Sequence, residues 1–369
     1  MHVAVIGAGI FGASVAYHLA ARGAQVTILH VGLERAASAT TFACLNLFGH
    51  ASLPFFELRR EAIAYHRELA TVLGCGGVLR ISGTLRLAAS DAQQEELERH
   101  AQLLNARGVR CERLRSHDVE AIEPGIDARH VVKGAVRVAA EGSAAPIPLI
   151  QTLLRAKHAQ GSVLVRQAAV HDGEEFPRGV RIACQGGNVV ADRVVLAVGT
   201  DTTALSSVFG HTVAIESHPG ILVSIEGAGH LVEHVVYAGD LHFRRAGRNL
   251  LVGHKGDLGR GGRPAADVVA TITNEILTDL RDWLPGLSAT AIYTADVGCR
   301  PMPTDGLPIV GWLPGHQRVY VAVGHGGITV APLVGKLAAQ EILEDRNLEM
   351  LAPFRVERFA ARKELALQE

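Results

Sequence analysis

One arginine, Arg300, stands in DVGCRPMPTDGLPIVG (296–311), a stretch that is rich in Gly and Pro and too apolar for a casual surface charge. A guanidinium group offers a planar fork that fits a carboxylate with two parallel hydrogen bonds, and such a pair is strong where water is excluded. We therefore expect Arg300 to bind a carboxylate. The alternative is a structural arginine that pairs with Asp305 or Asp296, or that caps backbone carbonyls.

The opening HVAVIGAGIFGASVAYHLAARGAQVTILH (2–30) reads as an apolar strand, a G-x-G-x-x-G turn, a helix and a second apolar strand. The first Gly permits a tight turn, the second lets the backbone approach a pyrophosphate, and the third lets helix and strand pack closely. The helix N-terminus presents free N–H groups to phosphates. This pattern predicts dinucleotide binding by Gly7, Gly9, Ile10, Phe11 and Gly12.

The second strand ends in His30, where such folds usually carry Asp or Glu for the ribose hydroxyls of the adenosine half. An imidazole can still bond a hydroxyl, and it also suits a 2′-phosphate, so NADP stays open as a ligand of this turn. Glu34, four residues later, is a less natural ribose ligand. The fingerprint alone does not choose between a nicotinamide and a flavin cofactor.

Three further segments favour a flavin. The loop 34–50 is rich in small and hydroxyl residues, precedes an amphipathic helix at about 54–73, and offers Ser38, Thr40 and Thr41 to phosphates. A buried strand ends at Gly199, and helix 147–159 and strand 163–166 lead to Ala169 and Val170, where we expect a strand beside the first. A strand at 319–323 meets a second glycine turn that opens a helix, with Gly324, His325, Gly326, Gly327, Ile328 and Thr329. That helix end would stabilise the negative charge of a reduced flavin.

Other polar clusters point to no second chemistry. His230 and His234 have the spacing of a metal pair on a helix, but they fall where a loop enters a strand, so we expect no metal. The basic cluster Arg244, Arg245 and Arg248 reads as a solvated hairpin, which could also dock an acidic partner. No G-x-S-x-G motif is present, which argues against an acyl-transfer hydrolase.

Composition sets the outer limits. A chain of 369 residues with 48% hydrophobic residues suggests about two domains with a large core. The net charge of -1 leaves no basic field for nucleic acid. Apolar runs are too short for a membrane span, and the first residues form a strand rather than a signal peptide. The five cysteines are widely spaced without a C-x-x-C pair, which is typical of a reduced, cytoplasmic protein.

Taken together, VIGAGIFGASVAYHLAARGAQVTIL, VVLAVG, GCRPMPTDGLPIVG and VAVGHGGITVAPLVG resemble the D-amino-acid oxidase superfamily of FAD-dependent oxidoreductases, end to end. The branch that looks most similar includes glycine oxidase, sarcosine oxidase, and the flavin subunits of hydroxyproline and opine dehydrogenases. The resemblance implies an α/β fold with a Rossmann-like FAD-binding domain (1–76, 140–205 and 296–369) interleaved with an antiparallel-sheet substrate domain (77–139 and 206–295). Alternating segments at 77–88, 213–226, 241–246 and 249–254 suit that second sheet, and a helix at 265–282 leads to a strand at 290–299.

The resemblance also implies an activity. Gly298-Cys299-Arg300-Pro301 matches a G-x-R-P arrangement whose arginine pairs with the substrate carboxylate. We expect a small amine or amino acid to lose a hydride to flavin N5, which gives an imine. His242, on a substrate-sheet strand, and His325, in the flavin turn, are the side chains to watch, although each could be structural. Leu45 and Asn46 would lie near the flavin ring, where relatives carry smaller residues.

Departures from the family leave alternatives. Sarcosine oxidases carry a lysine for oxygen reactivity where this chain has Leu251, and Lys255 is not equivalent, which favours another electron acceptor. We expect non-covalent FAD, with a covalent link through Cys299 or Cys44 as the alternative. The chain could act alone, as a homo-oligomer, or as the flavin subunit of a heteromeric dehydrogenase. An NAD(P)-dependent reductase and a flavin-binding protein without turnover are the remaining alternatives.

Overall fold

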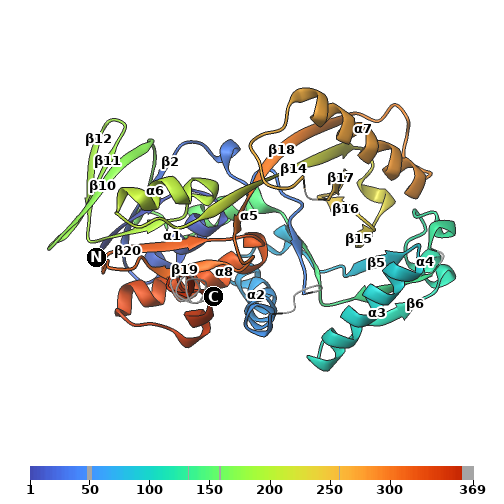
Figure 1. Cartoon of the computed structure of the whole chain (residues 1–369), viewed down its shortest axis with the longest axis horizontal. Helices are drawn as coiled ribbons and strands as arrows, with labels where there is room; N and C mark the ends of the chain where they lie inside the picture. Colours follow the sequence, from blue (N-terminus) through green and yellow to red (C-terminus); the bar gives the residue numbers. More distant parts are fainter. Residues whose placement is uncertain (48–51, 132, 158, 257, 360–369) are drawn as a thin grey trace, which may run out of the picture.

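A computed structural model describes residues 1–47, 52–131, 133–157, 159–256 and 258–359 (Figure 1). The last residues of the predicted loop 34–50 and of the predicted range 296–369 lie outside the described residues. One end of the molecule is built on a mostly parallel sheet with helices, and the other end carries a larger, mostly antiparallel sheet. The α/β fold class predicted from the sequence is confirmed.

The first sheet has the strand order β19-β20-β13-β1-β2-β9. Its neighbours are parallel except β19, which runs antiparallel to β20. Strands β1, β13 and β20 are short, buried apolar runs because both faces of the sheet are covered there. Their bounds are β1 (His2–Ile6), β2 (Gln25–His30), β9 (Val163–Gln167), β13 (Arg193–Leu196), β19 (Ile309–Trp312) and β20 (Val319–Val323).

Helices α1 (Ile10–Ala21) and α8 (Gly327–Glu344) pack on each other against this sheet. Helix α2 (Leu53–Val72) packs on α8, and α5 (Pro146–Arg155) packs on α1. Helix α1 is apolar and buried around most of its circumference, as expected for a helix with neighbours on several sides. Because α1 and α8 each begin directly after a glycine turn, their N-termini are fixed by the same packed pair.

The strand predicted at 163–166 is present as β9, but the strand expected beside β1 at Ala169 and Val170 is not there. Strand β9 pairs with β2 at the edge of the sheet, and β13 is the second neighbour of β1. Residues 169–170 instead lead into β10 (Val170–Phe176), which forms a separate antiparallel sheet with β11 (Gly179–Cys184) and β12 (Gly187–Ala191). The edge position agrees with Leu164, whose side chain is 62% exposed and suits no central strand.

The second large sheet has the order β18-β14-β17-β16-β15-β5-β7-β6, antiparallel except between β15 and β5. Helix α7 (Ala266–Trp283) packs on β14 and β17, and α3 (Asp91–Ala106) and α4 (Ser116–Ile122) pack near β7. The strands are β5 (Thr84–Ala88), β6 (Glu112–Leu114), β7 (Gly134–Val138), β14 (Ile215–Glu226), β15 (Val235–Ala238), β16 (Leu241–Ala246), β17 (Leu250–Lys255) and β18 (Tyr293–Pro303).

Short elements join the two ends. A three-stranded sheet has the order β3-β8-β4, with β3 (Cys44–Leu45), β8 (Gly142–Ala144) and β4 (Leu79–Arg80). The remaining helix is α6 (Thr202–Val208). The 3-10 turns are η1 (Leu33–Arg35), η2 (Gly76–Val78), η3 (Ala128–His130), η4 (Gly199–Asp201), η5 (Gly229–Leu231) and η6 (Glu349–Phe354).

Most predicted elements of the second sheet lie where the alternating pattern placed them, but the segment 77–88 is interrupted between β4 and β5. The division into two domains stays a prediction. Its boundary at 296 falls inside β18, which pairs along its length with β14 and so belongs with the large sheet. Figure 1 shows this strand pair extending from the large sheet toward the first one. No described helix is both long enough and apolar enough to cross a membrane.

Candidate active site

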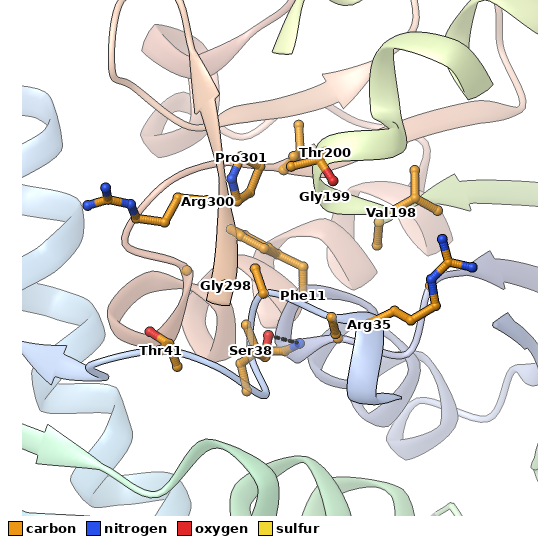
Figure 2. A pocket seen from close by; sticks show the side chains of 18 of the residues that line it. Phe11, Arg35, Ser38, Thr41, Val198, Gly199, Thr200, Gly298, Arg300 and Pro301 are labelled. Carbon is orange, nitrogen blue, oxygen red and sulfur yellow. Dashed lines mark hydrogen bonds between the residues drawn. The ribbon is translucent and has the colours of Figure 1, made fainter. Parts of the chain in front are cut away.

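A cavity of about 670 Å³ lies between the two large sheets. Its walls come from the turn after β1, the loop before α2, the end of β13, the turn before α8, and strands β14 to β18 (Figure 2). Segments far apart in the sequence therefore meet here, from within residues 6–59, 168–254 and 298–328. Near the first sheet the lining is rich in glycines and hydroxyls, and near the large sheet it contains Tyr237, His242, His254 and Arg300.

The glycines of the first turn are required by close backbone packing. Gly7 has a φ of +105°, and a Cβ on it would overlap the carbonyl of Ala197. A Cβ on Gly12 would overlap the carbonyl of Gly7 itself. Ser38 closes the turn, because its Oγ accepts a hydrogen bond of 3.1 Å from the Ile10 N–H at the start of α1 (Figure 2). The turn is thus held open as a backbone-lined cradle beneath α1.

His30 lines the cavity at the end of β2, as the sequence predicts. Its Nδ1 lies 3.1 Å from the Gly32 N–H and accepts from it, which leaves the proton of the neutral ring on Nε2. An Nε2–H group can donate to a ribose hydroxyl. Glu34 instead folds back over Gly32, where a Cβ would collide with its carboxylate. Glu34 therefore packs against its own loop and does not line the cavity.

The loop before α2 supplies one wall. Thr40, Thr41 and Asn46 line the cavity, whereas Leu45 is fully buried in the core behind it. Arg35 also lines the cavity, from the opposite side to Arg300 in Figure 2, although no motif singled it out. The only hint was its position in the same small-residue loop as the predicted hydroxyls.

Val170 and Gly199 line the cavity as predicted, and Gly199 has a φ of +59°. The turn after β20, which is the parallel neighbour of β13, and the start of α8 contribute Gly324, His325, Gly326, Gly327 and Ile328. A Cβ on Gly327 would stand 2.8 Å from the ring of Phe11, so the two glycine turns touch. Thr329 points away, and its Oγ1 donates to the Cys44 carbonyl at 3.2 Å.

Three predicted cofactor residues thus lie behind the cavity wall: Gly12, Leu45 and Thr329. Each has a packing reason. Gly12 lets α1 approach the turn, Leu45 fills the core, and Thr329 ties α8 to β3. The roles of these residues, and of those in the lining, remain predictions.

The other end of the cavity is formed by the large sheet. Arg300 on β18 reaches it beside Gly220 of β14, and both Arg300 and His254 stand within 4 Å of the place where a Cβ of Gly220 would be. The Arg300 guanidinium donates to the carbonyls of His218 at 3.4 Å and Pro219 at 3.3 Å. The carbonyl-capping alternative is therefore present, but these bonds are long and Arg300 also faces the cavity.

The carboxylate alternative that involves Asp305 has less support. Asp305 accepts bonds from Arg358 at 2.8 and 3.0 Å, outside the cavity.

Arg244 corrects another expectation. Its side chain is 5% exposed rather than solvated, and it donates to the Phe42 carbonyl and, at 2.9 Å, to the Arg245 carbonyl. Nothing in the sequence indicates that Arg244 is buried, because it stands in a basic run with Arg245 and Arg248.

Aromatic rings surround this end. The rings of Phe42, Tyr237, His242 and His254 form a connected group in which His242 lies 4.6 Å from Tyr237 and 5.9 Å from His254. His242 lines the cavity as predicted, directly opposite His254 in the sheet register. Tyr237 and His254 were missed by sequence reasoning. The strands predicted at 241–246 and 249–254 are adjacent in sequence, so their pairing could have placed His254 opposite His242 on the same face of the sheet.

Burial dominates the electrostatics here. Burial, followed by the positive potentials of His254, Arg86 and Arg300, lowers the pKa of His242 to about 3. The imidazole is therefore neutral at neutral pH. Burial also raises the pKa of the Tyr237 phenol well above its usual value, so that side chain stays protonated. The rings offer hydrogen bonds and contact area, and Arg300 offers the charge.

The structure also places the other side chains that the sequence singled out. Cys44 lines the cavity and Cys299 does not. Lys255 pairs with Asp279 at 3.0 Å, away from the cavity. The described residues hold no group of three or more metal-ligating side chains, and His234 pairs with the buried Glu123 at 2.7 Å.

Comparison with known proteins agrees with this arrangement. Residues 2–341 match the family model described as "DAO: FAD dependent oxidoreductase". This chain belongs to that family. It is an FAD-dependent oxidoreductase acting on amino acids or amines. It is 26% identical to glycine oxidase of Geobacillus kaustophilus over 96% of each chain. It is 24% identical to one of the opine oxidase subunits of Agrobacterium tumefaciens, over 97% of this chain and 98% of that one.

Solved structures of the family have the same fold. The crystal structure of glycine oxidase from Geobacillus kaustophilus superposes with a TM-score of 0.84 at 25% identity, over 96% of this chain and 97% of that chain. An L-proline dehydrogenase from P. horikoshii reaches the same TM-score of 0.84 at 18% identity, which shows the fold alone. The resemblance read from the motifs is confirmed at the level of the family.

Proposed function

We propose that this chain oxidises the C–N bond of a small amine or amino acid that carries a carboxylate, and that Arg300 binds that carboxylate. The observation that carries the proposal is the position of Arg300, which faces the cavity from the second large sheet while the glycine turns face it from the first. A carboxylate bound at this guanidinium would hold the rest of the substrate toward the glycine turns. Orientation of this kind is a large source of rate enhancement.

The cavity residues fit FAD. Gly7 and Gly9 line the cavity at the first glycine turn, Gly12 behind them lets α1 pack closely on that turn, and α1 and α8 both begin at the cavity without an acidic residue in their first turns. Ser38, Thr40, Thr41 and His30 would hold the phosphate and ribose groups, and the turn at 324–328 would face the flavin. When bound, FAD supplies the two-electron oxidant that takes up hydride as the C–N bond becomes an imine.

The proton chemistry asks little of the protein. Because the pKa of His242 is about 3, this imidazole can accept a hydrogen bond at neutral pH but is a weak general base. We propose that His242 orients the substrate with Tyr237, and that the amine reacts in its neutral form. Asn46 donates to the Tyr237 hydroxyl at 3.3 Å, which fixes the direction of that hydroxyl.

The first test is an anaerobic panel of glycine, sarcosine, proline, D-amino acids and opines mixed with the purified yellow protein. Loss of flavin absorbance with one compound identifies the substrate class. Admission of air then separates an oxidase, which recolours fast, from a dehydrogenase that needs another acceptor. A yellow protein that none of these bleaches, alone or with co-purified subunits, would contradict the proposal.

The role of Arg300 is tested with Arg300→Met. Loss of a partner from a buried, hydrogen-bonded charge pair costs about 2–5 kcal/mol, or about 30- to 4,000-fold in affinity. We expect KM for the identified substrate to rise by at least 30-fold while FAD stays bound. The matched control is Arg245→Met on β16, whose partly exposed side chain lies outside the cavity and bonds the Gly247 carbonyl and Glu233. Unchanged kinetics in Arg300→Met would remove the carboxylate role.

A second arrangement has a specific observation in its favour. The chain aligns over almost its whole length with a protein that is named as one subunit of an opine oxidase. We propose heteromeric assembly as the alternative to a flavoenzyme that acts alone. Size measurement of the protein purified from its native host, with identification of any co-eluting chain, distinguishes the two. The NAD(P)-dependent reductase is not retained, because the family is FAD-dependent.

A further inference from the structure

A fully enclosed guanidinium lies beneath the second glycine turn. Arg59, on α2, is only 3% exposed, yet it contributes to the cavity wall. We propose that Arg59 is a cofactor-tuning residue, whose positive charge stabilises the negative charge of reduced FAD and so raises the reduction potential of the cofactor. This inference rests on the proposed position of FAD in the cavity. It assigns a role to a residue that neither the glycine motifs nor Arg300 include.

The position of the guanidinium is fixed by several contacts. Its Nε donates to the Asn46 carbonyl at 2.7 Å, and its Nη2 donates to the Asn46 side chain and, at 3.2 Å, to Thr329 Oγ1. The group also lies over the ring of Phe55, at 5.2 Å from its centre. A charge held this firmly costs little reorganisation when the cofactor changes redox state.

The remaining nitrogen faces the turn. Arg59 Nη1 is 2.6 Å from the point where a Cβ on Gly326 would stand, and Gly326 has a φ of +70°. A glycine at this position therefore lets the guanidinium come directly against the turn that opens α8. The positive end of the α8 dipole and the Arg59 charge act on the same part of the cavity.

The cation is only partly compensated by the protein. Burial lowers the pKa of Arg59, and the Glu141 carboxylate opposes that shift. The Glu141 carboxylate does not serve Arg59 alone, because its Oε2 also lies 3.6 Å from Arg86 Nη2 and accepts a hydrogen bond of 2.5 Å from Thr84. An arginine stays protonated in such a place, and its unbalanced charge favours an anion within the cavity.

The competing account is that Arg59 only ties α2 to the segment at Asn46 and to α8. The two accounts differ in what a neutral variant does. Loss of a tie lowers stability or FAD affinity, whereas loss of a charge lowers the reduction potential of FAD that is still bound. The potential is therefore the decisive readout, and it does not depend on which substrate the enzyme uses.

The experiment compares Arg59→Gln, which removes the charge, with Arg59→Lys, which keeps it. The matched control is Arg60→Gln, the next residue of α2, whose side chain is 44% exposed and pairs at the surface with Glu61 at 3.3 Å. For each FAD-loaded protein, the two-electron potential is measured by equilibration with a reference dye. The affinity for sulfite, which adds to the flavin and leaves negative charge on the ring, is measured by absorbance.

In Arg59→Gln we expect the reduction equilibrium to fall at least tenfold, which is about 30 mV for two electrons, and sulfite to bind at least tenfold more weakly. Arg59→Lys should stay within threefold of the wild type, and Arg60→Gln should not change. An unchanged potential in yellow Arg59→Gln overturns the proposal, and so does an equal loss in Arg59→Lys. Either result leaves the proposed reaction and the role of Arg300 standing.

If Arg59→Gln fails to fold, Asn46→Asp takes its place, because it puts a carboxylate against the same guanidinium in nearly the same shape. We expect a lower potential and at least tenfold weaker sulfite binding. A potential and a sulfite affinity within threefold of the wild type would overturn the proposal, since charge at this position would then not reach the flavin.

Discussion

Substitution of Gly335 by alanine tests whether the contact between α1 and α8 is as close as the structure shows. Gly335 lies inside α8 and faces α1, and a Cβ there would stand 2.6 Å from the carbonyl carbon and 2.7 Å from the Cβ of Ser14. Real Cβ contacts essentially never fall below 3.0 Å, so the two helices must separate by about 0.4 Å or more. Two of the three nearest atoms belong to the backbone, so no rotamer change relieves the overlap.

Two opposing energies decide the size of the effect. Overpacking of a core contact costs about 1–3 kcal/mol, and the upper part of that range applies because backbone must move. Alanine is better than glycine inside a helix by about 1 kcal/mol. We therefore expect Gly335→Ala to lower the free energy of unfolding by about 1–2 kcal/mol, against the gain that helix propensity alone predicts.

The assay is urea unfolding of the FAD-loaded protein, followed by circular dichroism and flavin fluorescence. The midpoint should shift to lower urea with an unchanged slope. Gly77→Ala is the control, because a Cβ on Gly77 meets no atom within 4 Å. If Gly335→Ala is as stable as the wild type, or more stable, the close approach of α1 and α8 is wrong and the reasoning fails.

Two further predictions concern the first glycine turn and a buried histidine. Gly12→Ala should purify without bound flavin, because a Cβ overlaps the Gly7 carbonyl; flavin absorbance per protein measures this, and a fully yellow variant would contradict it. Burial and the nearby Lys336 lower the pKa of His18 to about 4 in the folded chain. Between about pH 6.5 and pH 4 the unfolded chain therefore binds more protons at His18 than the folded chain does. The stability that neutral His18 contributes is full above about pH 6.5 and is lost as the pH falls toward 4. His18→Gln should therefore lose less of its free energy of unfolding between about pH 7 and 5 than the wild type, by roughly 1–2 kcal/mol, and equal losses in urea titrations would contradict this.

Local pattern was sufficient for much of the fold. The apolar strand before Gly7 and the helical spacing after it predicted β1, α1 and β2, because each depends on neighbours in sequence. The pairing partner of β1 was not predictable in the same way. It is β13, which lies far along the chain, and nothing local distinguishes that apolar run from the one in β9.

Cavity residues that belong to a recognisable sequence motif were predicted. Cavity residues whose position is set by the packing of distant elements were missed. Arg300 was found because Gly and Pro surround it. Arg59 was not singled out from the sequence, yet the helical period of α2 places it on the face of the buried Phe55, Ile63 and His66. The helical period could have indicated that Arg59 is buried, but a charged side chain is usually taken as exposed. Arg244 was misjudged for the same reason within a strand.

The interleaving of the chain has a consequence for how the protein is made. Residue 12 closes the first glycine turn, but the turn at 324–327 and strand β20, which pairs with β13, are translated about 300 residues later. At about 5–20 residues per second, the nascent chain waits about 15–60 s before the first sheet can acquire its last parallel strand. In the last part of that interval, roughly 6–25 s between the synthesis of β13 and that of β20, the edge of β13 that later pairs with β20 has no partner and is open to wrong pairing. Cofactor loading is therefore a late event of synthesis, and a truncated chain would expose a sheet edge rather than a half-built site.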